Sequence, residues 1–470
     1  MLKLLSEKDR CKIHEAGLAV LEEVGVRLHN SKIYKIMLEA GAKEDKNDSK
    51  KLYFPREMVK KYFSMCPRQF EITDRKSNRK IIKSGGESLY FTSNATHYLR
   101  GTSKVPVEIG ESELIEFLRV VDKLDNVYGV VGTLIKEYEP KYRDFVGFRI
   151  MAQYTYKHLR PCIYTASGAE AIIEMADVVL DSKSLRENMI FSLGYSIVSP
   201  LTWSNEALEL FYRTRGYGIP MMINSEPMAG ATSPVTLAGS LAMADAEVIS
   251  GIVINQVLEP GRPCIYNIGF AHVMDMSTTQ ALTGAPENAL IQAAGSEMAE
   301  YHDLPSASWA LSDSLMLDSQ ASYEKMMTLM AHTLSKVNLI WGIGNIESSK
   351  TISPEIAVID NEMIGSCLRF SRGIKVDQEH IALDVIKEVG FDGSFLEVDH
   401  TFKHFREEIR HSTLPNRINR VNWEQYGSNS IEEKAEDVVA NILSNKSECY
   451  LNGTQIDKLL KIQTKWMERI

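Results

Sequence analysis

From about residue 87 to residue 372, short β-branched or aromatic runs alternate with amphipathic helical stretches. The runs fit buried parallel strands, whose residues are apolar because helices cover both faces. They are Leu89–Ser93, Val127–Leu134, Pro161–Ala166, Met189–Ile197, Ile219–Asn224, Pro263–Ile268, Ser306–Leu311 and Val337–Ile343. The predicted helices lie near residues 111–124, 143–158, 168–182, 203–215, 235–257, 285–301, 319–335 and 354–371. Eight strand–helix units predict an α/β fold, a closed (β/α)8 TIM barrel over residues 87–372, in preference to an open doubly wound sheet.

The stretch from Gly284 to Gln320 illustrates one such unit. Pro286 suits the first turn of a helix, where its missing N–H would be unpaired anyway. A short run of small and apolar residues then predicts a buried strand, and Trp309, Ser312 and Asp313 follow at its end. Because barrel enzymes keep their chemistry at the carboxyl ends of the strands, these side chains are candidates for a site.

Helical additions are predicted on both sides of the barrel. In the N-terminal helical region, residues 1–86, helices are expected after Ser6 as N-cap and over residues 31–40 and 55–63. Residues 83–110 predict an extra hairpin with a turn at Arg100–Gly101. In the C-terminal helical region, residues 373–470, helices are expected over 377–389, 430–443 and 455–470.

Charge, hydropathy and cysteine content limit the classes of partner and the cell compartment that we expect. The chain has 53 basic and 62 acidic side chains, so its formal net charge of -9 argues against nucleic acid as a partner. No apolar run approaches the length of a membrane span, and the N-terminus becomes charged too early for a signal peptide, so no membrane partner is expected. The six cysteines form no close pairs, which favours a reducing cytoplasm over a disulfide framework or a zinc ribbon.

The residues just past each predicted strand share one mouth of the barrel. They are Asn94, Thr96, His97, Thr133, Lys136, Tyr164, Thr165, Ser167, Tyr195, Ser196, Ser199, Asn224, Ser225, Glu226, Phe270, His272, Asp275, Trp309, Ser312, Asp313, Asn345 and Glu347. The set is rich in aromatic and acidic side chains and poor in cations. Aromatic faces and carboxylates attract cations, so the mouth predicts a cationic substrate.

Some of these residues have ordinary structural explanations. Trp309 is as consistent with core packing as with a site, and a lone histidine such as His97 or His272 more often hydrogen-bonds a loop than binds a ligand. The glycines of residues 342–345 lack the pattern of a phosphate loop. No metal-ligand spacing is present, so no metal site is predicted.

Motifs in fixed order along nearly the whole chain resemble the trimethylamine methyltransferase family. In the barrel they are Gly284-Ala-Pro-Glu, Tyr301-His-Asp-Leu-Pro305, Ser312-Asp313, Asp318-Ser-Gln-Ala-Ser-Tyr-Glu-Lys325, Asn338-Leu-Ile-Trp-Gly-Ile-Gly-Asn-Ile-Glu347 and Ile359-Asp-Asn-Glu362. In the tail they are Arg372-Gly-Ile, Leu383-Asp-Val-Ile-Lys-Glu-Val-Gly390, Phe395-Leu, Asp399-His-Thr401 and His404-Phe-Arg406. The resemblance implies a barrel enzyme that passes a methyl group from a methylamine to the Co(I) of a separate corrinoid protein.

One departure from the family pattern narrows the implied substrate. Archaeal members carry pyrrolysine near the end of the seventh strand, whereas ordinary residues, Ser312 to Leu315, occupy that stretch here. The chain therefore resembles the branch without pyrrolysine, whose members demethylate quaternary amines. Glycine betaine is the first expectation, and proline betaine, carnitine and γ-butyrobetaine are alternatives. A betaine also carries a carboxylate, which needs hydrogen-bond donors.

The resemblance and the mouth residues together give a specific expectation. It is a cytoplasmic, homo-oligomeric quaternary-amine methyltransferase that binds no cofactor tightly, because its partner corrinoid protein supplies the cobalamin. Candidate substrate-binding residues are Asn94, His97, Tyr98, Tyr195, Glu226, Phe270, Trp309, Asp313, Trp341, Asn345 and Glu347. A betaine-binding protein without turnover and a barrel lyase or hydrolase are the alternatives.

Overall fold

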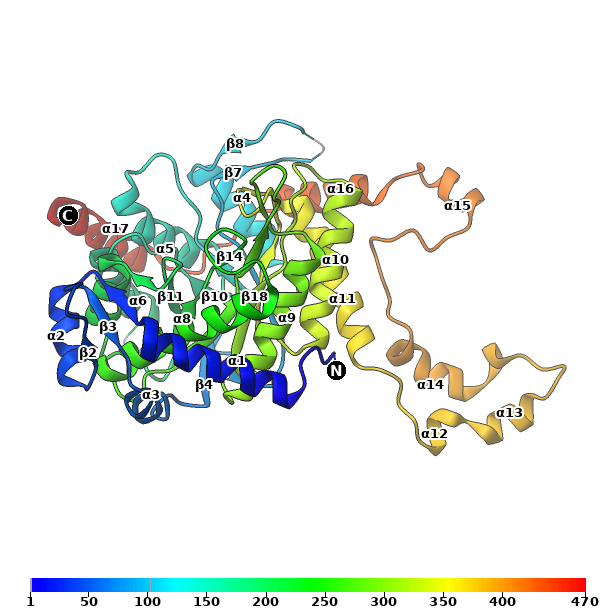
Figure 1. Ribbon diagram of the computed structural model, residues 1–470. Coiled ribbons are helices and arrows are strands. Elements are labelled where there is room, and N and C mark those ends of the chain that lie inside the picture. Colours follow the sequence, from blue (N-terminus) through cyan, green and yellow to red (C-terminus); the bar gives the residue numbers. More distant parts are fainter. Residues whose placement is uncertain (1, 102, 182) are drawn as a thin grey trace.

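The computed structural model describes residues 2–101, 103–181 and 183–470. Its centre is an eight-stranded parallel barrel, which confirms the predicted fold class (Figure 1). The barrel strands are β6 (Leu89–Thr92), β9 (Val127–Val131), β10 (His158–Arg160), β11 (Leu193–Ser196), β13 (Met221–Asn224), β15 (Cys264–Gly269), β18 (Ser306–Trp309) and β19 (Leu339–Ile343). The predicted N-terminal region, the predicted hairpin and the predicted helix at 168–182 each include one residue outside the described ranges, namely Met1, Thr102 and Ser182.

Backbone pairing closes the barrel in chain order. The last strand, β19, pairs in parallel with the first, β6. Between β10 and β11 the closure rests on a parallel bridge from Leu159 to Phe191. There the N–H of Leu159 donates to the carbonyl of Ile190 at 2.9 Å, and the N–H of Ser192 donates to the carbonyl of Leu159 at 3.2 Å. No barrel strand is left as an open edge.

The third strand lies earlier in the chain than the sequence analysis predicted. The predicted strand Pro161–Ala166 is wrong, because the ladder is formed by β10, His158–Arg160. The helix predicted at 143–158 ends at Tyr154 to make room for it. Pro161 has no N–H to donate and so ends the strand. Thr165 instead caps the next helix, with its side chain accepting from the N–H of Gly168 at 2.9 Å.

In the part of the chain that the structure describes, eight helices surround the barrel. They are α4 (Glu111–Asp122), α5 (Arg143–Tyr154), α6 (Ala166–Leu180), α7 (Asn205–Arg213), α8 (Leu237–Leu258), α9 (Pro286–Tyr301), α10 (Ser319–Leu334) and α11 (Pro354–Ser371). Contrary to the expectation from the sequence, α8 is long and apolar enough to cross a membrane by length and composition. However, 72% of its apolar window is buried inside the protein, as in the core helix of a soluble fold.

The N-terminal region contains the predicted helices and also strands that were not predicted. The helices are α1 (Glu7–Ala19), which continues as a π-helical turn over Val20–Val24, α2 (Ser31–Glu39) and α3 (Arg56–Phe63), and Ser6 caps α1 as expected. The added strands are β1 (Val26–Leu28), β2 (Lys43–Glu44), β3 (Lys51–Tyr53), β4 (Gln69–Thr73) and β5 (Arg79–Lys83). β1 pairs in parallel with β12 (Thr202–Trp203) of the barrel part, which ties the two regions together.

Two small sheets built from loops lie at the carboxyl ends of the barrel strands. One joins β7 (His97–Tyr98) and β8 (Val107–Glu108), the expected hairpin, to β20 (Asn345–Ile346) and β21 (Thr351–Ile352). The other contains β14 (Met228–Ala229), β16 (His272–Met274) and β17 (Ala281–Leu282). In Figure 1, β7, β8 and β14 lie on the upper side of the barrel, and α3 and β4 lie on the lower side. The loops therefore surround the mouth where a site was expected.

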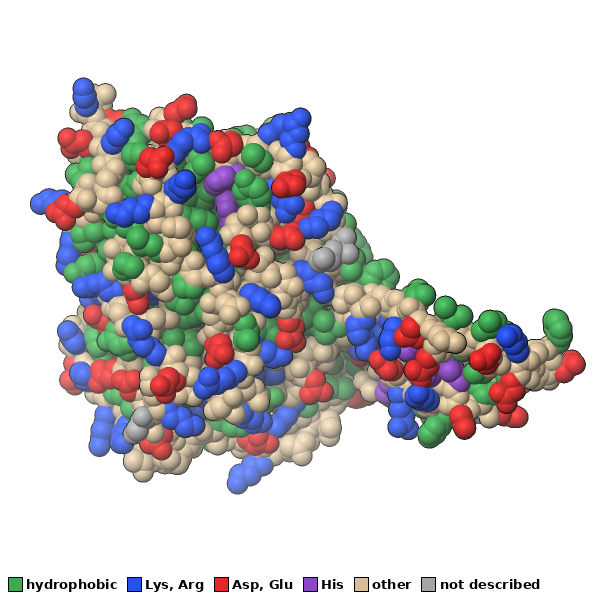
Figure 2. Space-filling view, turned by 90° about the horizontal axis from the view of Figure 1, so that it is seen from below, with side chains coloured by type: hydrophobic (Ala, Val, Ile, Leu, Met, Phe, Trp, Pro, Cys, Tyr) green, Lys and Arg blue, Asp and Glu red, His purple; other side chains and the backbone are tan. Residues whose placement is uncertain are grey.

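The C-terminal region divides into an arm and two helices that return to the barrel. The arm is residues 372–429 and includes α12 (Gln378–Ile381), α13 (Leu383–Val389), a 3-10 turn (Phe395–Glu397), α14 (Asp399–Glu408) and α15 (Arg420–Gln425). The single helix predicted at 377–389 is broken at Ala382, whose φ of 53° is left-handed. Figures 1 and 2 show the arm projecting from the body. Beyond it, α16 (Ile431–Ser444) packs on α4 and α11, and α17 (Gly453–Arg469) packs on α5 and α6.

Candidate functional site

A cavity of about 410 Å³ opens at the carboxyl ends of the barrel strands. Six of the eleven predicted site residues line it: Asn94, Tyr195, Glu226, Phe270, Trp309 and Trp341. Its other lining residues are Ser93, Val131, Arg160, Pro161, Cys162, Ile163, Gly194, Ser196, Asn224 and Ser349. Its volume falls within the usual range of small-molecule sites, roughly 300–1,000 Å³.

Three aromatic rings form one wall of the cavity. Trp309 and Trp341 are register partners on the adjacent strands β18 and β19. Phe270 stacks on Trp309 with ring centroids 4.5 Å apart and meets Trp341 edge-on at 5.5 Å. Trp309 is half-buried in the cavity wall rather than enclosed in the core. Such a wall offers π-faces to a cationic ligand.

Arg160 brings a positive charge into the cavity from the end of β10. The residue is only 4% exposed, and its guanidinium carbon lies 5.1 Å from the ring centroid of Trp341. Among the described residues its guanidinium has no hydrogen bond or ion pair, and Nη1 is buried without a partner. Burial lowers the pKa of Arg160 to about 9, so the side chain is still charged at neutral pH. A buried charge without a partner is costly, and an anionic ligand would offset that cost.

Gly194 on β11 makes the room that Arg160 occupies. A Cβ atom at position 194 would lie 1.9 Å from Nη2 of Arg160 and 2.7 Å from the carbonyl oxygen of Met222. Real Cβ atoms do not approach that closely, so any side chain here would displace the guanidinium or the neighbouring strand. The position of the arginine therefore depends on the glycine.

A carboxylate, that of Glu226, lies in the same cavity. Ser196, Asn224 and Asn267 are in register on β11, β13 and β15. Asn267 donates to Asn224 at 3.0 Å, Asn224 donates to Ser196 at 3.4 Å, and the hydroxyl of Ser196 donates to Glu226. Burial raises the pKa of Glu226, while the Ser196 hydrogen bond and nearby His272 oppose that rise. The cavity thus holds one acidic and one basic group with an aromatic wall.

The model of the trimethylamine methyltransferase (MTTB) family matches residues 1–467. The chain belongs to the trimethylamine methyltransferase family. It contains only standard residues, including those from Ser312 to Leu315, and so it is placed in the branch without pyrrolysine.

Relatives within this family carry two different substrate names. The chain is 30% identical over 452 residues to trimethylamine methyltransferase MttB of Desulfitobacterium hafniense, covering 94% of this chain and 89% of that protein. It is 29% identical over 428 residues to a glycine betaine methyltransferase from another strain of that organism, covering 89% and 88%. The monomethylamine methyltransferase MtmB of Methanosarcina barkeri has a TM-score of 0.50 at 12% identity, covering 93% of this chain and 94% of that one, which shows a shared fold.

Five predicted site residues of this family member lie outside the cavity, and three of them hold the loops of the mouth together. Asp313 accepts from the N–H groups of Thr283 and Gly284 at 2.8 and 2.9 Å and from the hydroxyl of Ser348 at 2.6 Å. Asn345 donates to the carbonyl of Asn94 at 3.3 Å. Glu347 accepts from Thr351 at 2.6 Å.

The other two predicted residues, His97 and Tyr98, form β7. A ring nitrogen of His97 lies 3.0 Å from the hydroxyl of Thr96, and Tyr98 is buried within the small sheet. His272, for which a loop role was the alternative, has a ring nitrogen 3.1 Å from the carbonyl of Phe270. Hydrogen bonding within loops accounts for the two histidines, and packing within the small sheet accounts for Tyr98.

Arg160 is a charged residue of the cavity that the sequence analysis does not predict. The predicted third strand places Arg160 before a strand rather than at the end of one, so the predicted mouth is poor in cations. A signal was present, because Pro161 follows Arg160 directly and proline ends a ladder. Cys162, whose pKa is raised by burial, was missed for the same reason.

Proposed function

We propose that the chain transfers a methyl group from a quaternary amine that carries a carboxylate, glycine betaine first among them, to the Co(I) of a separate corrinoid protein. The observation that carries the proposal is the buried Arg160, which has no anionic partner among the described residues and shares a cavity with Glu226 and an aromatic wall. A betaine has the complementary charges. Its carboxylate would accept from Arg160, and its ammonium would lie among Trp309, Phe270 and Glu226.

The charge arrangement favours a betaine over trimethylamine. Trimethylamine has no carboxylate, so Arg160 would remain a desolvated charge without a partner in the complex, at a cost in binding free energy. The relative named glycine betaine methyltransferase is nearly as similar to this chain as the relative named trimethylamine methyltransferase, and similarity alone does not choose between them. Proline betaine, carnitine and γ-butyrobetaine have the same pair of charges. They differ in the length of the carbon chain between the ammonium and the carboxylate, and this distance would decide which of them fits between the aromatic wall and Arg160.

The proposed reaction requires no proton transfer to or from a protein side chain. The electron pair of Co(I) attacks a methyl carbon in line, the carbon–nitrogen bond breaks, and its electron pair stays on nitrogen. The products are methyl-Co(III) and a neutral tertiary amine, dimethylglycine from glycine betaine. Because the leaving nitrogen needs no proton, the cavity residues would hold the methyl group in line and exclude water.

The cobalamin would come from a partner protein that docks over the barrel mouth. The two loop sheets around the cavity are the surface available for it. A homo-oligomer is supported by the arm, where Ile374, Phe391, Leu396 and Phe402 are exposed, and Figure 2 shows hydrophobic side chains out to its end. Such apolar surface suits contact with a second copy in the cytoplasm. Light scattering of the full chain and of a Phe391→Ser variant tests that assembly.

A spectroscopic assay tests the proposed function. The protein is mixed with its corrinoid protein held as Co(I), and the cobalamin spectrum is followed after adding glycine betaine, each alternative betaine or trimethylamine. Formation of methyl-Co(III) with a betaine, and far less with trimethylamine, is the expected result. Turnover of trimethylamine alone would contradict the carboxylate argument, and calorimetric binding of betaine with no methyl transfer would favour a betaine-binding protein.

A further inference from the structure

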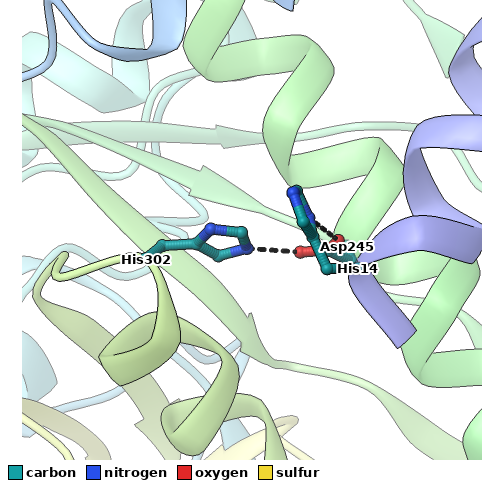
Figure 3. Close-up of side chains that lie close together, drawn as sticks. All are labelled: His14, Asp245 and His302. Carbon is teal, nitrogen blue, oxygen red and sulfur yellow. Dashed lines mark hydrogen bonds and ion pairs between the residues drawn. The ribbon is translucent and has the colours of Figure 1, made fainter. Parts of the chain in front are cut away.

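Two histidines and an aspartate from distant parts of the chain meet at the opposite end of the barrel from the cavity. His14 comes from α1, Asp245 from α8 and His302 from the residue after α9 (Figure 3). Nδ1 of His14 lies 3.1 Å from Oδ2 of Asp245, and Nε2 of His302 lies 3.0 Å from Oδ1. His302 precedes the first residue of β18, whereas Trp309 of the cavity ends that strand. The cluster is therefore at the amino ends of the strands.

The geometry of the cluster suits a divalent transition-metal ion. One ligand atom of each side chain lies within 4.8 Å of the other two. Zinc bonds to histidine nitrogen and carboxylate oxygen at about 2.0–2.2 Å, which puts tetrahedral ligand atoms roughly 3.4 Å apart. The two nitrogen–oxygen separations, to Oδ2 and to Oδ1 of Asp245, are a few tenths of an ångström shorter than that, so an ion between the imidazoles would bind one or both of these oxygens. A bound ion would take the place of the protons that now bridge each imidazole to the carboxylate.

The surroundings of the cluster fit a site with one open coordination position. The hydroxyl of Tyr266 donates to Oδ1 of Asp245, the kind of second contact that fixes a ligating carboxylate. Asp245 is fully buried, but the His14 side chain is 20% exposed. Both histidines line a second cavity of about 360 Å³, which gives an ion a path of entry. Lys60 and Arg68 also line it and would favour an anion or water as the fourth ligand.

We infer that His14, Asp245 and His302 form a binding site for a divalent transition-metal ion, Zn²⁺ being the best match to the ligand set. The site joins the N-terminal helix to two barrel helices. At the amino ends of the strands such a site serves stability rather than the chemistry of the mouth. No ligand spacing in the sequence predicts this site, because its three ligands are spread over three separate elements.

Metal binding by the full, untagged chain tests the inference. The protein is stripped with a chelator, dialysed and titrated with Co²⁺ while the visible absorption bands of the ion are recorded. Metal content after Zn²⁺ loading and dialysis is measured by mass spectrometry, and the melting temperature is measured with and without Zn²⁺. We expect one equivalent of metal and a higher melting temperature in the Zn²⁺-loaded protein.

Variants separate a metal site from a hydrogen-bonded cluster. His14→Gln and Asp245→Asn should lose the bound equivalent, and Tyr266→Phe should weaken metal affinity about 10–100-fold. His29→Gln removes an exposed histidine outside the cluster and should bind metal like the wild type. His14 lies at the half-exposed face of α1, so its variant is the one most able to fold. Wild-type protein that takes up less than one equivalent, or variants that take up as much as wild type, would overturn the inference.

Discussion

Replacing Arg160 with methionine should weaken betaine binding without destabilising the fold. Methionine keeps an unbranched apolar stem but removes the charge. Because Arg160 has no hydrogen-bond or ion-pair partner among the described residues, its loss leaves no protein group unpaired. The melting temperature of the variant should stay the same or rise, since a desolvated charge has been removed.

The expected loss of affinity follows from the strength of the proposed contact. A hydrogen bond to a charged group contributes about 1.5–3 kcal/mol. At 1.4 kcal/mol per tenfold change, the dissociation constant of glycine betaine should rise about 10- to 150-fold. Trimethylamine lacks the carboxylate, so its affinity should not fall. Titration calorimetry with both ligands measures the two effects.

Arg149 on α5 provides the matched control. It is also mostly buried, but it pairs with Glu111 at 3.1 Å and donates to Gln153 at 2.9 Å. Arg149→Met should therefore lower stability by about 1–3 kcal/mol while leaving betaine affinity intact. If Arg160→Met instead behaves like Arg149→Met, losing melting temperature and keeping its affinity, Arg160 is a structural residue and the carboxylate argument is refuted.

Three further outcomes are expected. Trp309→Ala should weaken betaine binding by about 1–2 kcal/mol and should reduce stability by less than the roughly 3–5 kcal/mol lost with a core tryptophan; calorimetry and thermal unfolding check both, and the reverse pattern would make Trp309 a core residue. Burial raises the pKa of Glu226, so the carboxylate loses its charge at a higher pH than usual as the solution is acidified; betaine affinity should fall there in the wild type and stay flat in Glu226→Gln, and a flat wild-type profile would exclude the contact. Methyl transfer to the corrinoid protein should slow as ionic strength rises, because the docking surface is screened, while betaine affinity changes little; a parallel fall of rate and affinity would rule out charge-guided docking.

Most barrel strands could be predicted because they are continuous apolar runs. The third strand could not, since β10 is only His-Leu-Arg and two of its three side chains are polar. His158 is nevertheless buried, with its ring nitrogens 2.9 Å from the carbonyl of Thr73 and 3.1 Å from the hydroxyl of Ser192. Burial lowers the pKa of His158 to about 4, so it lies in the barrel uncharged. A strand that carries a buried histidine and the cavity residue Arg160 lacks the expected apolar pattern.

Site residues could be predicted from the sequence where an aromatic side chain lies in or just past a predicted barrel strand. Phe270 and Trp309 lie at or just past strand ends, Trp341 lies within β19, and all three line the cavity. Asp313 and Asn345 lie at strand ends too, yet their hydrogen bonds go to neighbouring loops. Sequence alone does not distinguish a polar side chain that binds a ligand from one that binds backbone. The short N-terminal strands were missed for a related reason, because β1 depends on a partner, β12, that is remote in sequence.

The contact between Gly194 and Arg160 also restricts the order in which residues at these two positions can have been substituted. An arginine at position 160 needs the volume that a side chain at position 194 would fill, so glycine has to be present before the arginine is tolerated. Once both are in place, any side chain added at position 194 would displace the guanidinium, so the glycine has to stay for as long as the arginine does. Under the proposed function, finding the same glycine and arginine in another member of the family would predict that its amine substrate also carries a carboxylate.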